Sequence, residues 1–184
     1  YGLEIFIQKK MGRLNGWMNY TYSISRKLFN DMEYYTNWDR THAFNILGNY
    51  RLSKKWDFNF KWTYQTGQPY TPILGYYSEF GNEEDFEVIP GGRNSARFED
   101  YHRLDFGAVR HYNYKGWKID IFIQVINLYW QNNPFTHVYV FGDSQNGIDD
   151  DSNGEIDEAG ENIPIKKEVN GFPLLPTIGF KIDF

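Results

Sequence analysis

The stretch that decides the fold is Lys55–Gln65, which reads KWDFNFKWTYQ. Its even positions are all aromatic, and its odd positions are all polar or charged. Successive side chains of a β-strand point to opposite faces of the sheet. This period of two therefore predicts a strand with one aromatic face and one polar face.

The same alternation recurs in six other stretches, so the sequence predicts seven strands and no helix. These stretches are Leu3–Ile7, Trp17–Ser25, Thr41–Leu52, Arg103–Tyr114, Trp117–Val125 and Thr177–Phe184. Short turns at Met11–Gly16, Leu52–Lys54 and Lys115–Gly116 alternate with longer loops at Lys27–Arg40, Gly67–Phe98 and Trp130–Phe172. The connections predict an up-and-down meander with a short-turn end and a long-loop end, as in outer-membrane barrels.

Composition narrows the class of protein. Aromatic residues make up 20% of the 184 residues, and the chain has no cysteine. The missing cysteine excludes disulfide scaffolds and Cys-ligated zinc. No run of apolar residues is long enough for a transmembrane helix, and the first residues lack the apolar core of a signal peptide.

The ends of the predicted apolar faces favour a membrane barrel over a soluble sandwich. These faces begin or end with Trp, Tyr or Phe, for example at Trp56, Tyr64, Trp117 and Tyr129. Aromatic girdles at the two membrane interfaces give this pattern, whereas sandwich cores lean on Val, Ile and Leu. Strands of about 10–12 residues also suit a tilted membrane span.

The acidic residues gather in two of the long loops. Residues 79–100 carry seven acids and two bases, and residues 141–168 carry nine acids and two bases. The net charge of the whole chain is -5, so the rest of the chain is basic. A basic body with two acidic loops lacks the single basic face of a nucleic-acid binder, and we expect no nucleic-acid partner.

The odd number of predicted strands indicates whether they can form a complete barrel. With a C-terminus at the short-turn end, the seventh strand and the first strand run in the same direction. Bacterial single-chain barrels have even numbers of strands and close on themselves, and an open strand edge in lipid leaves backbone groups unsatisfied. We therefore expect the chain to be the C-terminal piece of a larger barrel.

Several segments resemble the C-terminal barrel region of TonB-dependent outer-membrane receptors. They follow one another in the order found in that family and cover most of the chain except the two acidic loops. The segments are Gly16–Ser25 (GWMNYTYSIS), Trp38–Asn45 (WDRTHAFN), Tyr50–Trp56 (YRLSKKW), Tyr64–Thr71 (YQTGQPYT), Tyr101–Phe106 (YHRLDF), Val125–Phe135 (VINLYWQNNPF) and Leu175–Phe184 (LPTIGFKIDF).

The resemblance implies an all-β, antiparallel transmembrane barrel of about 22 strands, of which this chain would supply seven. It implies residence in the outer membrane of a Gram-negative bacterium and energised import of a scarce, bulky ligand such as an iron chelate, cobalamin or a glycan. The implied partners are outer-membrane lipid, the barrel-assembly machinery, and TonB through parts of the protein absent from this chain. A surface lipoprotein stays open as a further partner. Residues 129–172 would form a long Asp-rich extracellular loop before the last strand.

The C-terminus resembles the signal that the barrel-assembly machinery reads on last strands. Gly179, Ile182 and Phe184 follow a Gly-x-x-apolar-x-Phe spacing. We expect Phe184 to end the chain on an interface aromatic and Gly179 to leave room for a close strand. The alternative interpretation is an ordinary amphipathic final strand.

The Asp-rich loop has the spacing of a calcium site. Calcium loops of the EF type place oxygen ligands at positions 1, 3 and 5 and a glycine at position 6. Position 12, normally Glu, is Gly160 here. We hypothesise that calcium binds this loop, the alternative being a solvated acidic loop; calcium titration calorimetry distinguishes the two. The candidate ligands are Asp149, Asp151, Asn153, Glu155 and Asp157.

Five aromatic residues in the loops are candidates for contact with a sugar or chelate, the alternative role being packing within the loops. They are Tyr34, Tyr35, Trp38, Tyr76 and Tyr77. The four histidines are scattered and have no metal-binding spacing, and no nucleotide or hydrolase motif occurs. Asp100 with His102 is the one candidate pair for catalysis. We therefore predict no enzyme activity.

Three other functions remain as alternatives. A passive outer-membrane porin would share the barrel but lack a plug domain. A soluble sugar-binding β-sandwich would bury the apolar faces against a second sheet and need no detergent. An outer-membrane hydrolase would depend on His102.

Overall fold

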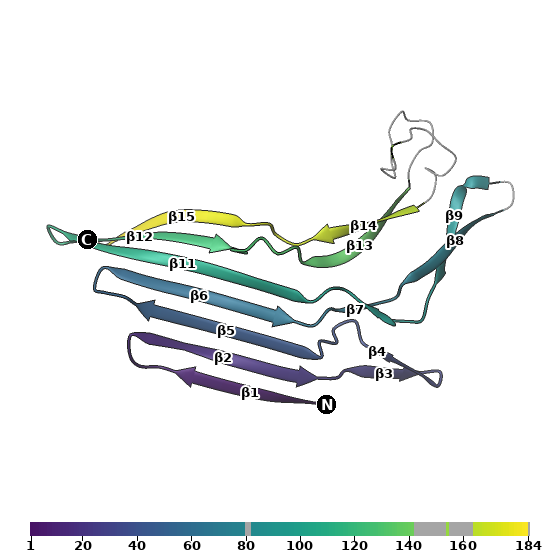
Figure 1. Ribbon diagram of the computed structural model, residues 1–184, viewed down its shortest axis with the longest axis horizontal. Coiled ribbons are helices and arrows are strands. Elements are labelled where there is room, and N and C mark those ends of the chain that lie inside the picture. Colours follow the sequence, from purple (N-terminus) through teal and green to yellow (C-terminus); the bar gives the residue numbers. More distant parts are fainter. Residues whose placement is uncertain (80–81, 142–153, 155–163, 184) are drawn as a thin grey trace.

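Every regular element in the described part of the chain is a β-strand (Figure 1). The computed structural model describes residues 1–79, 82–141, 154 and 164–183. Within these ranges no helix is long and apolar enough to cross a membrane. The all-β prediction is confirmed.

Seven long strands form one antiparallel sheet and confirm the seven predicted strands. The sheet is open, with β1 at one edge and β15 at the other, and the strands lie in chain order (Figure 1). The strands are β1 (Gly2–Lys9), β2 (Leu14–Ser23), β5 (His42–Arg51), β6 (Trp56–Gln65), β11 (Tyr101–Tyr114), β12 (Trp117–Ile126) and β15 (Leu175–Asp183).

The pairing register joins the apolar positions of all seven strands into one face. Residues paired across an antiparallel sheet point to the same side. One row of paired residues crosses all seven strands. In strand order it consists of Lys9, Gly16, Gly48, Phe60, Phe106, Val125 and Pro176. We call the side that carries Phe60 the apolar face and the opposite side, which carries Asp57 and Asn59, the polar face.

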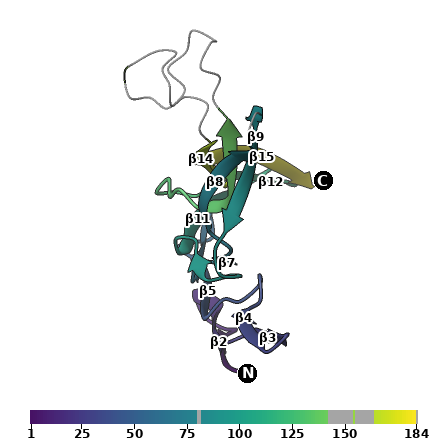
Figure 2. The ribbon, with the colours of Figure 1, turned by 90° about the vertical axis from the view of Figure 1, so that its right-hand side faces the viewer.

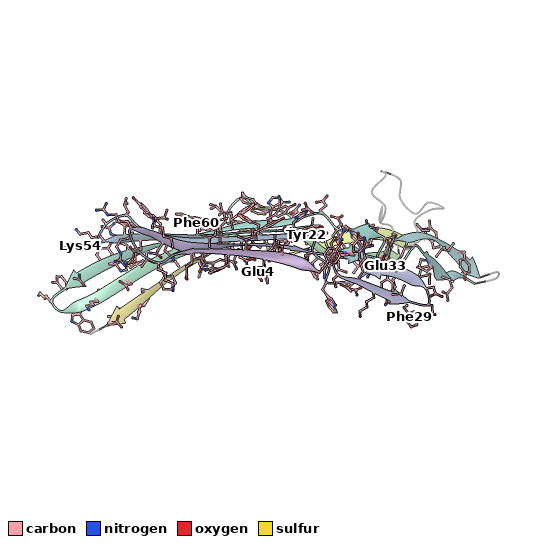
Figure 3. The ribbon with its side chains drawn as sticks, turned by 90° about the horizontal axis from the view of Figure 1, so that it is seen from below. Glu4, Tyr22, Phe29, Glu33, Lys54 and Phe60 are labelled. Atoms are coloured by element: carbon pink, nitrogen blue, oxygen red, sulfur yellow. The ribbon has the colours of Figure 1, made fainter. Side chains whose placement is uncertain are left out.

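The sheet is a single layer without a hydrophobic core. No Ala, Val, Leu, Ile, Met, Phe, Trp or Tyr side chain that the structure describes is buried, and Ile178 and Phe180 of the apolar face are each 73% exposed. Viewed along the strands, the long strands stack into one twisted layer (Figure 2). Side chains project from both sides of this layer (Figure 3). No second sheet covers it in the described ranges, so the described part of the chain forms no sandwich.

The long loops contain further strands that the alternation of side chains does not predict. Their pairs extend beyond the long-loop end of the sheet (Figure 1). The strands are β3 (Arg26–Phe29) with β4 (Met32–Tyr35), β7 (Pro69–Tyr70) with β10 (Ala96–Arg97), β8 (Ile73–Glu79) with β9 (Asn82–Pro90), and β13 (Pro134–Phe141) with β14 (Pro164–Asn170). The region 129–172 thus carries a hairpin of its own.

Turn chemistry explains one of these missed hairpins. β3 and β4 are joined by Asn30 and Asp31, both with positive φ, of 50° and 59°. Two-residue hairpin turns of this kind match the twist of the strands, and Asn and Asp tolerate the left-handed region. The three short turns lie at the opposite end of the sheet, which confirms the predicted short-turn and long-loop ends (Figure 1).

Two glycines of the sheet lie beneath aromatic rings of the neighbouring strand. Gly48 lies against the ring of Phe60 on the apolar face, and Gly179 against the ring of Phe122 on the polar face. A Cβ at either position would overlap the ring. Gly179 therefore makes room for the ring of Phe122.

We predict that Gly179→Ala destabilises the sheet, because the added methyl group must displace the ring of Phe122. Overpacking of this kind costs about 1–3 kcal/mol. Gly75→Ala is the control, since its Cβ would lie 3.8 Å from the nearest atom, Cδ1 of Ile89. Urea unfolding measures both variants, and equal losses would show that the ring does not occupy this place.

Candidate functional site

The polar face of the sheet holds all the ion pairs between residues of its strands. Arg103 and Asp105 pair at 2.9 Å, and Lys181 and Asp183 at 2.8 Å. Amide and hydroxyl groups extend the network across neighbouring strands, as in the hydrogen bond of 3.2 Å from Thr63 to Asn45. This face is therefore suited to water or to a polar partner.

His111 is the centre of a charged cluster on the polar face near the short-turn end. Its Nδ1 lies 2.6 Å from Asp120, and its Nε2 lies 3.2 Å from Asp57. Arg51 pairs with the other oxygen of Asp57 at 3.3 Å. Carboxylate oxygens accept hydrogen bonds, so both contacts are satisfied when both ring nitrogens carry a proton. The cluster borders a hollow of about 410 Å³ that Lys118 also lines.

An ion pair with a fully buried carboxylate joins two distant segments at the long-loop end. The carboxylate of Asp39 is fully buried, and Arg97 of β10, 58 residues away in the chain, donates to it. The other oxygen of Asp39 accepts a 2.6 Å hydrogen bond from the backbone amide of Ser25. Arg97 also donates to the carbonyl of Gly67 at 2.9 Å. This pair joins the segment before β5 to the segments beside β7 and β10.

Arg40 and Asp100 extend this network to the strand ends. Arg40 donates to the carbonyl of Thr66 at 2.8 Å, and burial, followed by the nearby charge of Arg97, lowers the pKa of its guanidinium. Asp100 accepts hydrogen bonds from the hydroxyl of Tyr64 at 2.6 Å and from the amide of Gly67 at 2.9 Å. Polar contacts therefore hold these loop ends to the strands.

The candidate contact residues Tyr34 and Tyr35 are engaged by arginines. The guanidinium of Arg93 lies 4.4 Å from the ring centre of Tyr34. Tyr35 lies between Arg26 at 4.7 Å and Arg97 at 4.8 Å. The structure therefore gives Tyr35 a packing role within the loop network.

Asn94 adds a further connection to the same hairpin. Its side chain donates to the carbonyl of Tyr35 at 2.6 Å and to the side chain of Asn37 at 2.7 Å. The neighbouring Trp38 is 75% exposed. Trp38 is thus open to a ligand, while Tyr35 is held in place.

Tyr76 and Tyr77 lie on a different hairpin, in β8. They are 38% and 53% exposed, and as consecutive strand residues they point to opposite sides. The structure thus divides the five candidates between the β3–β4 region and the β8–β9 hairpin and does not gather them into one site.

Two asparagines shape the chain after β12. Asn127 is fully buried, with a φ of 55°, and its side chain donates to the carbonyls of Gln131 at 2.9 Å and Phe172 at 3.1 Å. Asn133 accepts a hydrogen bond of 3.0 Å from the amide of His102 and donates to its carbonyl at 3.1 Å. These contacts fasten the beginning and the end of the 129–172 region to the sheet.

The suspected catalytic pair is not formed. The ring of His102 contacts the hydroxyl of Tyr129 at 2.8 Å, whereas Asp100 has Tyr64 and Gly67 as partners. His137 of β13 packs against Tyr70 and Phe98, with ring centres 4.9 Å and 4.5 Å away. Burial lowers its pKa, which is typical of a histidine that packs in its neutral form.

The candidate calcium ligands Asp149, Asp151, Asn153, Glu155 and Asp157 lie outside the described residues. In the described ranges no group of three His, Asp or Glu side chains is arranged to hold a metal ion. Of the C-terminal signal, Gly179 and Ile182 lie in β15 and Phe184 lies outside the described residues. Ile182 is paired with Ile119 on the apolar face.

Sequence reasoning missed the residues that build the loop network. Asp39 and Arg40 lie in one of the segments that carry the family resemblance, but Arg93, Asn94 and Arg97 lie in the predicted loop Gly67–Phe98, outside those segments. The spacing between Asp39 and Arg97 gives no local signal for their pairing. In comparisons with known proteins, no protein-family model, no curated protein and no solved structure matches the chain significantly.

We predict that Asp39→Ala loosens the long-loop end, because it leaves Arg97 without its anion and the amide of Ser25 without its acceptor. Breaking a fully buried ion pair costs about 3–5 kcal/mol, and we expect a smaller loss here because the side chain of Arg97 is 29% exposed. Glu33→Ala is the matched control, since the Arg26–Glu33 pair at 2.9 Å is exposed and contributes about 0–1 kcal/mol. Hydrogen exchange of the Ser25 amide should accelerate in the first variant only; unchanged exchange in both would contradict the role of Asp39.

Proposed function

We propose that this chain forms part of the wall and the extracellular loops of a TonB-dependent outer-membrane transporter. The wall would belong to a barrel of about 22 strands. The transported ligand would be scarce and bulky, such as an iron chelate, cobalamin or a glycan. TonB would act through a plug domain on a part of the protein outside this chain.

One observation carries the membrane part of this proposal: an apolar face that runs across all seven strands of a single-layer sheet and is left uncovered. Burial of apolar surface stabilises proteins by about 25 cal/mol per Å². A soluble protein that leaves such a face in water forgoes this stabilisation, and large exposed apolar patches mark interaction sites. Lipid acyl chains would cover the face, as they cover the outer wall of transmembrane barrels.

The distribution of aromatic residues on the apolar face supports the same interpretation. Rings gather near both ends of the face, and aliphatic side chains are more frequent between them, as interface girdles require. At the long-loop end two tyrosine hydroxyls contact histidine rings. The hydroxyl of Tyr20 lies 2.9 Å from Nδ1 of His42, and that of Tyr129 lies 2.8 Å from Nδ1 of His102. The short-turn end carries Tyr50, Trp56, Tyr112, Tyr114 and Trp117.

The polar face would line the lumen, where it would meet water and the plug domain. Its ion pairs and the His111 cluster suit such a surface. The long-loop end would face the outside, where exposed Trp38, Tyr76 and Tyr77 are the candidates for ligand contact. We further propose that calcium orders the Asp-rich loop on this side.

The resemblance to the receptor family supplies the transporter part of the proposal. The segments that carry it also hold the network at the long-loop end. Trp38–Asn45 contains Asp39 and Arg40, Tyr64–Thr71 contains Gly67, and Val125–Phe135 contains Asn127 and Asn133. These residues fasten the extracellular loops to the wall, which a ligand-capturing surface requires.

Bimane labelling tests the membrane face, because the chain has no native cysteine. Cysteines replace Phe58, Phe60 and Trp62 in one set of variants and Asn59, Lys61 and Thr63 in the control set. We expect brominated lipids to quench bimane on the first set and leave the second set bright. Equal quenching in both sets, or none in the first, would refute a lipid-facing apolar face.

Transport distinguishes the receptor from a passive porin. The intact protein extracted from membranes should be several times heavier than 21.9 kDa and carry a plug sequence upstream of this chain. Uptake of its ligand should stop in cells that lack TonB. A native 22 kDa species would refute the transporter.

A further inference from the structure

We propose that Arg110 binds the phosphate of a phospholipid head group in the membrane leaflet at the short-turn end. Trp56 and Tyr112 complete this site on the apolar face. The inference rests on the proposed function, because the site needs an apolar face that meets lipid.

The register places a single arginine among aromatic and aliphatic neighbours. Arg110 of β11 pairs with Trp56 of β6 on one side and with Ile121 of β12 on the other. Its guanidinium carbon lies 5.1 Å from the ring centre of Trp56 and 4.8 Å from that of Tyr112. The side chain is exposed. Two rings therefore hold the cation at the surface of the face.

No carboxylate in the described ranges neutralises this charge on its own side of the sheet. The described strands place no Asp or Glu on the apolar face, and their acids point to the polar face. Two cations on the polar face at this end differ in this respect, because Arg51 pairs with Asp57 and His111 with Asp120. Lys9, at the end of β1, is the one other Lys or Arg on the apolar face. The charge of Arg110 thus calls for an anion from outside the described sheet.

The adjoining turns carry charge of the same sign. The three short turns contain no Asp or Glu, and their bases are Lys10, Arg13, Lys54, Lys55 and Lys115. Lys54 lies at this end of the sheet (Figure 3). Lys115 lies 5.3 Å from the ring centre of Tyr114. A cationic rim beside an aromatic girdle complements a layer of phosphates above acyl chains.

The chemistry of the guanidinium fits a phosphodiester. Its planar set of N–H donors can give two parallel hydrogen bonds to two phosphate oxygens. Stacking against Trp56 and Tyr112 fixes the plane, so less rotational freedom is lost when the phosphate binds. The methylene groups of Arg110 stay over the apolar face while the charge reaches the head-group layer.

Native mass spectrometry of the intact, detergent-purified protein tests the site with two probes. Phosphatidylglycerol carries the phosphate, and diacylglycerol with the same acyl chains lacks it. The test variant is Arg110→Gln, and the control is Lys118→Gln, an exposed cation at the same end on the polar face. A further variant, Tyr112→Leu, keeps the charge and an apolar side chain but removes one ring.

We expect Arg110→Gln to raise the dissociation constant of phosphatidylglycerol about fivefold, in line with ~1 kcal/mol per basic residue at a membrane surface. Tyr112→Leu should weaken phosphatidylglycerol binding by a smaller factor, and Lys118→Gln should leave it unchanged. Diacylglycerol binding should be the same for all four proteins.

Two results would overturn the site. Unchanged phosphatidylglycerol binding by Arg110→Gln excludes it, and an equal loss for diacylglycerol shows that the arginine acts through packing alone. The bimane experiment on β6 distinguishes a failure of the phosphate site from a failure of the lipid-facing wall. Quenching at Phe58 with no effect of Arg110→Gln refutes the phosphate site alone, whereas no quenching at Phe58 refutes the lipid-facing wall and the site together.

Discussion

The structure depends on the hydrogen-bonded register of one seven-stranded sheet. No large hydrophobic side chain that the structure describes is buried, so packing against a second layer cannot set the strand order or the strand offsets. Pairing of backbone groups does so, and a shift by one residue would move every side chain of a strand to the other face. The unbroken apolar face from Leu3 to Ile182 exists because all six pairings keep the same parity.

This register also explains why the loops are held by polar groups. Each long loop leaves the sheet at the same end, where ring contacts among Tyr70, Phe98 and His137 join two of the loops and polar contacts fasten the loop ends. The contacts at the strand ends are polar. Arg97 pairs with Asp39, Asp100 accepts a hydrogen bond from Tyr64, and the side chain of Asn133 accepts one from the backbone amide of His102. A buried ion pair adds little net stability compared with apolar packing, but its two groups must be held in a defined geometry. The network therefore fixes where the loops begin more than it stabilises the fold.

The sequence predicts the sheet well because its information is local. A period of two in KWDFNFKWTYQ suffices to assign β6, and the turn Lys115–Gly116 suffices to join β11 to β12. The sequence does not predict the β3–β4 hairpin, because its strands are short and its turn, Asn30–Asp31, is a weaker hairpin signal than Asn-Gly. The Arg97–Asp39 pair escaped because a contact across 58 residues depends on register and loop path, neither of which periodicity encodes. The Phe122–Gly179 contact escaped for the same reason.

The two faces of the sheet differ in the charged residues that they carry. On the polar face, cations and carboxylates alternate and neutralise one another, as in the Arg103–Asp105 and Lys181–Asp183 pairs. On the apolar face, carboxylates are excluded from the described strands, and the two cations stay near the short-turn end. A face that merely met water would have no reason to exclude one sign of charge. A face that ends at a layer of phosphates would, because a carboxylate at that depth is repelled while a lysine or arginine is attracted.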